Sequence, residues 1–399
     1  MAIDLTALRA HFPSLDTGIA FFDGPGGTQT PRPVADAIAA TLTGPLSNRG
    51  TVSPSELNAE RAVADFRAAY ADLLHVPANG IVHGRSATQL TYDFSRHLAK
   101  GWNPGDEIIL SRLDHDANVR PWIQAAERAG VAVRWIEIDA ETTELDLDSY
   151  ERALSPRTRL VAVTAASNVL GTKPPLRRIA DRAHEAGALV YVDGVHYAAH
   201  HLVDVPALGA DLFVCSPYKF LGPHCGVLAA APAFLETVRP DKLVPSSDTV
   251  PERFEFGTLP YEILAGATAA VDFLAELDPG TGTSRRERLA HSLHSLHEHE
   301  LTLRARLQDG LESLGDAITV HSKAPDRTPT LLVSIEGRDA REAQVHLAAR
   351  DVVAPAGSFY AYEPFTALKL EGPALRAGLA PYNTTDDVDR FLDGLADFL

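Results

Sequence analysis

The sequence predicts an α/β fold built around a mostly parallel β-sheet. Short apolar segments alternate with helix-like stretches of about 10 to 15 residues over roughly the first 270 residues. Parallel strands need such helical connections, and the helices cover both faces of the sheet, so the strands are apolar throughout. At 399 residues the chain also exceeds the ~100 to 200 residues usual for one domain. We therefore expect two packed regions, of which the first holds the sheet.

The predicted elements of the first region begin with an amphipathic helix over residues 53–75. This segment starts with Ser-Pro, carries a glutamate in its first turn and places apolar residues at helical spacing. A further helix is predicted over 175–186. Six apolar segments are predicted as strands: 107–110, 131–138, 159–163, 188–192, 212–215 and 226–229. Ligands bind at the carboxyl ends of such strands, so we expect functional residues directly after them.

The second region has the pattern of a smaller α+β unit. A polar helix is predicted over 284–314, a strand over 331–335, a helix over 341–350 and a last helix from about residue 385. The Gly- and Pro-containing segment 278–284 is typical of a linker. We predict a large domain over 15–275 and a small domain formed by 1–14 together with 285–399.

Composition excludes several classes of protein. The chain has 36 basic and 53 acidic residues and a formal net charge of −17, which disfavours nucleic-acid binding. We find no signal peptide and no apolar stretch of about 18 residues, so no membrane association is expected. The two cysteines, Cys215 and Cys225, form neither a disulfide framework nor a metal site. We expect a reducing, cytoplasmic setting and no bound metal.

Two polar groups stand directly after neighbouring predicted strands. Asp193 directly follows the apolar run 188–192, and His196 comes three residues after Asp193. An aspartate at this position can instead cap a helix or turn, so Asp193 alone does not distinguish a ligand-binding role from a structural one. Lys219 is flanked by Tyr218 and Phe220. Lys219 can be a solvated loop residue. If its surroundings are apolar, its side chain must be paired, neutral or covalently bound, because burying an isolated charge is costly. Desolvation would then lower its pKa and make its amine nucleophilic.

Taken together, Asp193-Gly-Val-His196 and Ser216-Pro-Tyr218-Lys219, whose Asp and Lys are 26 positions apart, resemble a known family. They are similar to pyridoxal-phosphate enzymes of fold type I, in particular the class V aminotransferase and cysteine desulfurase family. The resemblance implies a large domain with a mostly parallel seven-stranded sheet and a smaller α+β domain. It also implies pyridoxal 5'-phosphate as the cofactor. In that family the lysine binds the cofactor covalently and shuttles a proton, the aspartate pairs with the pyridinium nitrogen, and the position of His196 contacts the phenolic oxygen.

The resemblance extends to the residues that bind the cofactor's phosphate. Gly84-Arg-Ser86-Ala87-Thr lies where the family has Gly-Thr-Thr-Glu before a helix, which implies that Ser86 and the Ala87 amide hold phosphate at a helix N-terminus. Arg85 stands where the family usually has a threonine, and we assign no role to it. Ser216 and Tyr218 replace the family's Ser-Xaa-His and can both still donate to phosphate.

Three further motifs imply contacts with the ring and the substrate. Asp114-His115-Asp-Ala-Asn118 resembles the family's Glu-His-His-Ala-Asn, which implies that His115 stacks on the ring and moves protons; a surface histidine is the alternative. Ser-Asn168-Val-Leu-Gly-Thr matches a family hexamer whose asparagine lies near the cofactor and substrate. In Arg376-Ala-Gly-Leu-Ala-Pro-Tyr-Asn-Thr, the arginine would bind the substrate α-carboxylate, with a helix-end arginine as the alternative.

A homodimer with active sites completed across the interface is expected from one more motif. Phe254-Glu-Phe-Gly-Thr258 resembles the family's Phe-Glu-Xaa-Gly-Thr, whose threonine reaches the phosphate bound by the neighbouring subunit.

One segment departs from the cysteine desulfurases. Those enzymes carry a cysteine on a mobile loop that takes up sulfur as a persulfide, whereas residues 353–361 of this chain hold no cysteine. Cys215 and Cys225 lie in or beside predicted strands and are expected to be inert. We therefore expect an enzyme acting on an amino acid, foremost a carbon-sulfur lyase on cysteine or an S-substituted cysteine without a persulfide relay. An aminotransferase or amino-acid epimerase is the alternative, and a catalytically silent scaffold is a remote one.

Overall fold

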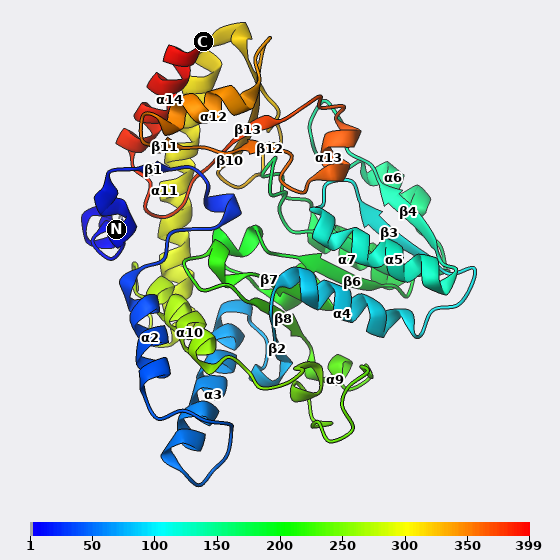
Figure 1. Ribbon diagram of the computed structural model, residues 1–399. Coiled ribbons are helices and arrows are strands. Elements are labelled where there is room, and N and C mark those ends of the chain that lie inside the picture. Colours follow the sequence, from blue (N-terminus) through cyan, green and yellow to red (C-terminus); the bar gives the residue numbers. More distant parts are fainter. Residues whose placement is uncertain (1–2) are drawn as a thin grey trace.

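The computed structural model describes residues 3–399 and contains a central sheet of seven strands (Figure 1). The spatial order is β2-β8-β7-β6-β5-β3-β4. Only β8 runs antiparallel to its neighbours, and the pairs from β7 to β4 are all parallel. The strands are β2 Ile81–Gly84, β3 Glu107–Ser111, β4 Ala132–Ile136, β5 Thr158–Thr164, β6 Leu189–Asp193, β7 Leu212–Cys215 and β8 Gly226–Ala230. The predicted α/β fold with a mostly parallel sheet is confirmed.

Helices cover both faces of this sheet, because successive side chains of a strand point to opposite faces. In β5, Leu160 and Ala162 join one hydrophobic core and Val161 and Val163 join the other. The first core is closed by α4 Ala87–Ala99 and α5 Arg120–Ala129, and the second by α3 Pro54–Leu74, α7 Leu176–Glu185 and α10 Tyr261–Ala275. Both faces of the strand are buried, which explains its continuous apolar sequence.

A second, antiparallel sheet has the order β12-β13-β10-β9. Its strands are β9 Ile318–Val320, β10 Thr330–Ile335, β12 Ala356–Gly357 and β13 Ala374–Gly378. It shares a hydrophobic core with α11 Arg285–Ser313, α12 Ala340–Ala348 and α14 Thr385–Phe398. The long helix α11 runs from this core to α10 beside the central sheet (Figure 1). It therefore packs in both halves of the molecule.

The remaining elements connect these layers. β1 Ala20–Phe21 pairs in parallel with β11 Val352–Val353 in a separate two-stranded sheet, which packs on the same core as the second sheet. The other helices are α1 Leu5–Arg9, α2 Arg32–Thr43, α6 Leu147–Ala153, α8 Val205–Leu208, α9 Pro232–Leu235 and α13 Tyr362–Ala367. Within residues 3–399, no helix combines the length and the apolar character needed to cross a membrane.

The elements expected from the sequence are present, and their ends lie within about two residues of the expected ones. α3 and α11 begin with capping boxes, in which Ser53 and Ser284 accept from the N–H groups of Glu56 and Glu287. The sequence analysis missed β2, because only two apolar residues, Ile81 and Val82, precede His83-Gly84 and show no strand pattern. The proposed domain limits stay a prediction, and residues 1–2 of the small domain lie outside the described residues.

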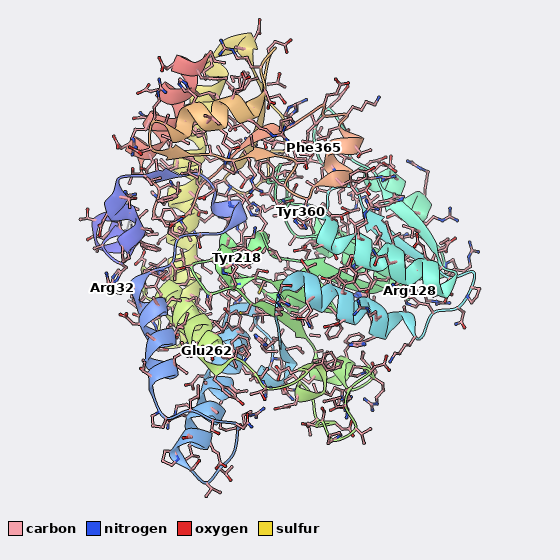
Figure 2. All side chains as sticks on the ribbon, in the orientation of Figure 1. Arg32, Arg128, Tyr218, Glu262, Tyr360 and Phe365 are labelled. Atoms are coloured by element: carbon pink, nitrogen blue, oxygen red, sulfur yellow. The ribbon has the colours of Figure 1, made fainter. Side chains whose placement is uncertain are left out.

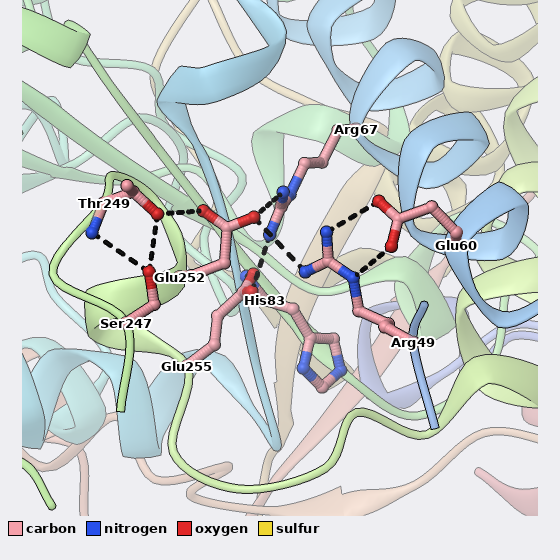
Figure 3. A network of polar contacts seen from close by, with 8 residues as sticks. All are labelled: Arg49, Glu60, Arg67, His83, Ser247, Thr249, Glu252 and Glu255. Carbon is pink, nitrogen blue, oxygen red and sulfur yellow. Dashed lines mark hydrogen bonds and ion pairs between the residues drawn. The ribbon is translucent and has the colours of Figure 1, made fainter. Parts of the chain in front are cut away.

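A network of ion pairs ties the segment 252–258 to α3 (Figure 3). Arg67 of α3 contacts Glu252 at 2.6 Å and Glu255 at 2.7 Å. Glu255 is nearly buried, and it also accepts the His83 N–H of β2 at 3.0 Å. Burial raises the pKa of Glu255, and Arg67 opposes this shift. The network therefore positions the segment that carries Thr258.

Replacing Arg67 by methionine is expected to lower the free energy of unfolding by about 3 kcal/mol, because it leaves Glu255 buried without its charged partner. Urea unfolding followed by circular dichroism measures this loss. The control is Arg96→Met, which removes an exposed pair with Asp93 and should cost less than about 1 kcal/mol. Equal losses in the two variants would contradict the structural role of the network.

Candidate active site

The candidate site lies at the carboxyl ends of the parallel strands, where the sequence analysis expected it. Asp193 is the last residue of β6, and His115, Asn168 and Lys219 lie beyond the ends of β3, β5 and β7. All four line an inner cavity of about 80 Å³. The same cavity is lined by Ser86, Ala87, His196, Ser216 and Tyr218. The structure thus brings together every residue expected to bind cofactor except Thr258.

An outer cleft of about 680 Å³ adjoins the inner cavity. His115, Asn168, Tyr218 and Lys219 line both spaces, and Arg376 lines the outer one. Tyr218 and Tyr360, which both line the cleft, lie near the middle of the molecule between the central sheet and the elements around the second sheet (Figure 2). A ligand in the inner cavity can therefore meet a second molecule that enters from the cleft.

Lys219 ends the short 3₁₀ helix Pro217–Lys219 that follows β7. Its Nζ donates to the carbonyl oxygen of Pro25 and lies 5.1 Å from the centroid of the Tyr218 ring. Burial lowers the pKa of Lys219 to about 7; the Arg376 guanidinium adds to this shift and Asp193 opposes it. A large fraction of the amine is therefore neutral, and nucleophilic, near neutral pH.

Asp193 presents a buried carboxylate to the inner cavity. Its Oδ1 accepts the Val195 N–H at 2.9 Å. Burial raises the pKa of Asp193 to about 6, while this hydrogen bond and Lys219 oppose the shift. A cationic group in the cavity would favour the ionised carboxylate, so Asp193 is suited to hold a protonated ring nitrogen.

His115 is held as a neutral ring with a defined tautomer. Its Nδ1 accepts the Ala117 N–H at 3.0 Å, so the ring proton lies on Nε2. Burial lowers the pKa of His115 to about 4, and Lys219 and Arg376 add to this shift. Asp114, which the sequence analysis did not select, fixes the preceding turn by accepting from Ser111 Oγ at 2.5 Å. His115 can stack and donate one hydrogen bond without carrying charge.

Asn168 and Arg376 lie together although 208 positions separate them in the chain. Arg376 Nη1 donates to the Asn168 carbonyl oxygen at 3.0 Å, and Arg376 is nearly buried. Neither Arg376 Nε nor Asn168 Oδ1 has a hydrogen-bond partner among the described residues, although both atoms are buried. Burial lowers the pKa of Arg376 to about 9, and the Asp23 carboxylate, also missed in the sequence analysis, opposes this. These unpaired groups are suited to a polar ligand.

His196 lines the inner cavity, but its Nε2 faces the second sheet. It lies 2.9 Å from Thr328 Oγ1 and 3.1 Å from Thr330 Oγ1. Behind it, His200 Nδ1 lies 2.9 Å from the buried Glu300 carboxylate of α11. Burial lowers the pKa of His196 well below its ordinary value. The two threonines hold the His196 ring from a segment distant in sequence, Glu300 holds the adjacent His200, and the contact of His196 with a cofactor stays a prediction.

The N-terminus of α4 forms one end of the inner cavity. Ser86 caps this helix by accepting the Gln89 N–H at 3.1 Å. The N–H groups of Ala87 and Thr88, in the first turn, have no acceptor within the helix. Gly226 passes so close that a Cβ there would lie 2.3 Å from the Ser86 carbonyl carbon. Glycine at 226 thus allows β8 to pass beside a helix end suited to an anion.

Thr258 is the one predicted cofactor residue outside the cavity of its own chain. It is exposed, and its Oγ1 lies 3.5 Å from Asn48 Oδ1. Its expected contact belongs to a neighbouring subunit and stays a prediction.

The segment 353–361 closes the outer cleft on one side without contributing a thiol. The carbonyl oxygen of Phe359 accepts from Asn168 Nδ2 at 3.0 Å, and that of Tyr360 accepts from the Asp116 N–H at 2.8 Å. Cys215 and Cys225 are buried and unpaired, and neither lines the cavity or the cleft. Burial raises the pKa of both thiols, that of Cys225 to about 12. Both cysteines are therefore poor nucleophiles, as expected.

Comparisons with known proteins find relatives that are similar to this chain over nearly its whole length. An uncharacterised protein of Mycobacterium tuberculosis is 31% identical over 397 residues, which cover 99% of each chain. A cysteine desulfurase of Klebsiella pneumoniae is 31% identical over 421 aligned residues, covering 99% of this chain and 98% of the relative. The crystal structure of the cysteine desulfurase CsdA from Escherichia coli superposes with a TM-score of 0.87 at 25% identity, covering 100% of this chain and 98% of the other.

The family comparison identifies the chain's class. The family model described as aminotransferase class-V matches residues 20–391 of this chain. This range includes every residue that lines the cavity and the cleft. Members of this family use pyridoxal phosphate. The chain therefore belongs to the class V aminotransferase family of pyridoxal-phosphate enzymes.

Proposed function

We propose that this enzyme is a carbon-sulfur lyase that acts on cysteine or an S-substituted cysteine without a persulfide relay. The observation that carries the proposal is the composition of the site. The cavity unites a nucleophilic lysine with a buried carboxylate, while no thiol lines the cavity or the cleft in residues 3–399. The similarity to cysteine desulfurases supports a cysteine-type substrate. The missing thiol favours direct release of sulfide or a thiol.

The residues of the cavity fit pyridoxal phosphate. Lys219 supplies an amine for its aldehyde, and Asp193 a carboxylate for its pyridinium nitrogen. The first-turn amides of α4, with Ser86 and Ser216 nearby, supply donors for its phosphate. The buried, unpaired Oδ1 of Asn168 is available to a polar ring substituent. We assign further cofactor contacts to Ala87, His196 and Tyr218, and from the neighbouring subunit to Thr258.

The residues around the cofactor divide the work of the reaction. When bound, pyridoxal phosphate supplies an electron sink that stabilises negative charge on the substrate Cα. Arg376 binds the α-carboxylate through its guanidinium fork, and Asn168 supports this contact. Lys219 would remove the Cα proton, while the Asp193 carboxylate would keep the pyridine nitrogen protonated. His115 would stack on the ring of the bound cofactor, and its Nε2–H would then be offered to the departing sulfur.

The overall reaction is an elimination that needs no oxidant. The Cβ–S bond breaks, and its electron pair leaves with the sulfur as sulfide or a thiolate. Water then converts the three-carbon remainder into pyruvate and ammonia. This balance explains how the site can dispense with a thiol that accepts sulfur.

Assembly and location form part of the same proposal. The exposed Thr258, presented by the Arg67 network, supports a homodimer whose active sites are completed across the interface. The two buried and unpaired cysteines agree with a reducing, cytoplasmic setting.

In protein freed of cofactor, the rate at which Lys219 combines with pyridoxal phosphate is expected to rise with pH and to level off above about pH 7. The reason is that only the neutral amine attacks the aldehyde, and the pKa of Lys219 is about 7. Stopped-flow absorbance at a series of pH values measures the midpoint. A midpoint near that of an ordinary lysine, about 10, would contradict the desolvated environment.

The decisive experiment incubates the cofactor-loaded enzyme with L-cysteine and with S-methyl-L-cysteine and measures sulfide or methanethiol together with pyruvate. We expect equal amounts of thiol and pyruvate. The doubly substituted Cys215→Ala, Cys225→Ala variant should retain this activity, because neither thiol takes part.

Other outcomes would replace the proposal. Conversion of the bound cofactor to its amine form without release of sulfur would indicate an aminotransferase. Solvent deuterium at Cα without net conversion would indicate an epimerase. Loss of activity in the folded cysteine-free variant would contradict a reaction without a persulfide relay.

A further inference from the structure

We propose that the outer cleft selects cysteine derivatives whose sulfur carries an aryl or similarly large apolar group, with Phe359 and Tyr360 as specificity-determining residues. This inference rests on the proposed carbon-sulfur lyase activity. It goes further by naming the substituent on sulfur and the residues that recognise it.

The first observation is the size and lining of the cleft. Its volume of about 680 Å³ is in the range of pockets that enclose drug-sized ligands, whereas the side chain of cysteine is one methylene and one sulfur. Five residues with aromatic rings line it: Tyr92, His115, Tyr218, Phe359 and Tyr360. Rings pack favourably against rings in offset or edge-to-face arrangements. The cleft therefore offers an apolar substituent both room and matching surfaces.

The second observation is the conformation of the segment that carries Phe359 and Tyr360. Both residues have left-handed backbones, with φ of 54° and 53°, which is unfavourable for side chains of this size. Hydrogen bonds hold each of them: Asn168 Nδ2 binds the Phe359 carbonyl oxygen, and the Asp116 N–H binds that of Tyr360. The donors come from the loops after β5 and β3. The site itself thus holds the backbone that carries the two rings.

The two rings have different surroundings. The Phe359 ring lies under the Arg376 guanidinium, with 4.0 Å from Cζ to the ring centroid. It helps to orient the group that binds the α-carboxylate. The Tyr360 ring centroid lies 5.6 Å from the His115 ring centroid, and the residue Tyr360 is 77% exposed, so a ligand can still cover it. An apolar group on the substrate sulfur would gain contact with Tyr360 in particular.

Charge at the mouth of the cleft argues against an anionic substituent. Arg120 lines the cleft, but it pairs with Asp116 at 2.8 Å and with Glu363 at 2.8 Å. These two carboxylates already satisfy its guanidinium. A second carboxylate on the substrate would meet no free cation there, which favours an uncharged substituent.

The chemistry also suits an aryl group. Elimination breaks the Cβ–S bond and sends the electron pair to sulfur, and an arenethiolate is a weaker base and better leaving group than an alkanethiolate. The products are an arenethiol, pyruvate and ammonia, with water as the only co-reactant. No thiol of the enzyme is consumed, in agreement with the lining of the cleft.

The test compares S-phenyl-L-cysteine with S-methyl-L-cysteine, measuring thiol release by the cofactor-loaded enzyme. We expect kcat/KM to be at least about tenfold higher for the phenyl compound. Tyr360→Ala should reduce this preference at least about fivefold. Tyr362→Ala is the matched control, because Tyr362 is exposed and close in sequence but does not line the cleft; it should leave the preference unchanged.

Binding of two amino acids that lack sulfur separates recognition from leaving-group chemistry. L-Homophenylalanine and L-norvaline carry a methylene where the phenyl and methyl compounds carry sulfur. Calorimetry should show homophenylalanine binding about tenfold more tightly to the native enzyme, with the difference much reduced in Tyr360→Ala. Thiol release from both cysteines with equal binding of the two analogues would overturn this inference alone. No thiol from any cysteine derivative would overturn the proposed function and this inference with it.

Discussion

Replacing Lys219 by alanine is expected to remove the visible absorbance of the lysine-bound cofactor and to lower kcat more than about a thousandfold. In the proposed mechanism, the variant loses both the amine that attaches the cofactor and the base that takes the substrate Cα proton, and one positioned base alone contributes about 10² to 10⁴-fold. The neighbouring side chains remain, so the variant should still bind the cofactor without a covalent bond.

The control for this variant is Lys173→Ala. Lys173 is also a partly buried lysine, but it pairs with Asp326 at 2.7 Å and lies outside the cavity and the cleft. It should keep both the absorbance and the activity. Added methylamine should restore part of the activity of Lys219→Ala. An unchanged absorption band in Lys219→Ala would show that another lysine binds the cofactor.

Replacing Arg376 by glutamine is expected to lower kcat/KM about a hundredfold or more. The loss of a buried charged partner costs about 2 to 5 kcal/mol, and each 1.4 kcal/mol corresponds to a factor of ten. Arg376→Lys should recover only part of the loss, because an ammonium lacks the planar fork that matches a carboxylate. Steady-state kinetics with the best cysteine derivative measure both effects.

A substrate without a carboxylate provides the internal test of this assignment. The corresponding S-substituted cysteamine has nothing for Arg376 to bind, so native enzyme and Arg376→Gln should bind it with similar affinity. A hundredfold difference for this compound as well would mean that Arg376 acts on the architecture of the site and not on the α-carboxylate.

Periodicity predicted the layers of the fold because burial has a direct signature in the chain. Strand segments covered on both faces are continuously apolar, as in residues 160–163 of β5, and helices that face a core repeat their apolar residues at helical spacing. β2 has no such signature. It is recognised only through its pairing with β8, so the seventh strand came from the family resemblance and not from the local pattern.

The residues of the site likewise fall into those that the sequence reveals and those that it does not. Asp193 and Lys219 could be found from the sequence, because each follows an apolar strand and the two stand at a characteristic separation. Asp114 had a weaker signal, an asparagine four residues later that donates to it at 2.7 Å. Asp23 and Glu300 had none, since an acidic residue that becomes buried looks like any other in the sequence.

The sequence by itself determined the class of fold, the choice of Lys219 and Asp193 as candidate cofactor residues, and the absence of a cysteine between residues 353 and 361. Only the tertiary structure decided what surrounds them. Asn168 meets Arg376 across 208 positions, and His200 meets Glu300 across 100. The left-handed turn at Phe359 and Tyr360 is held by hydrogen bonds from distant loops. Such contacts follow from the packing of two sheets and a shared helix, and no local pattern records which partner a side chain will meet.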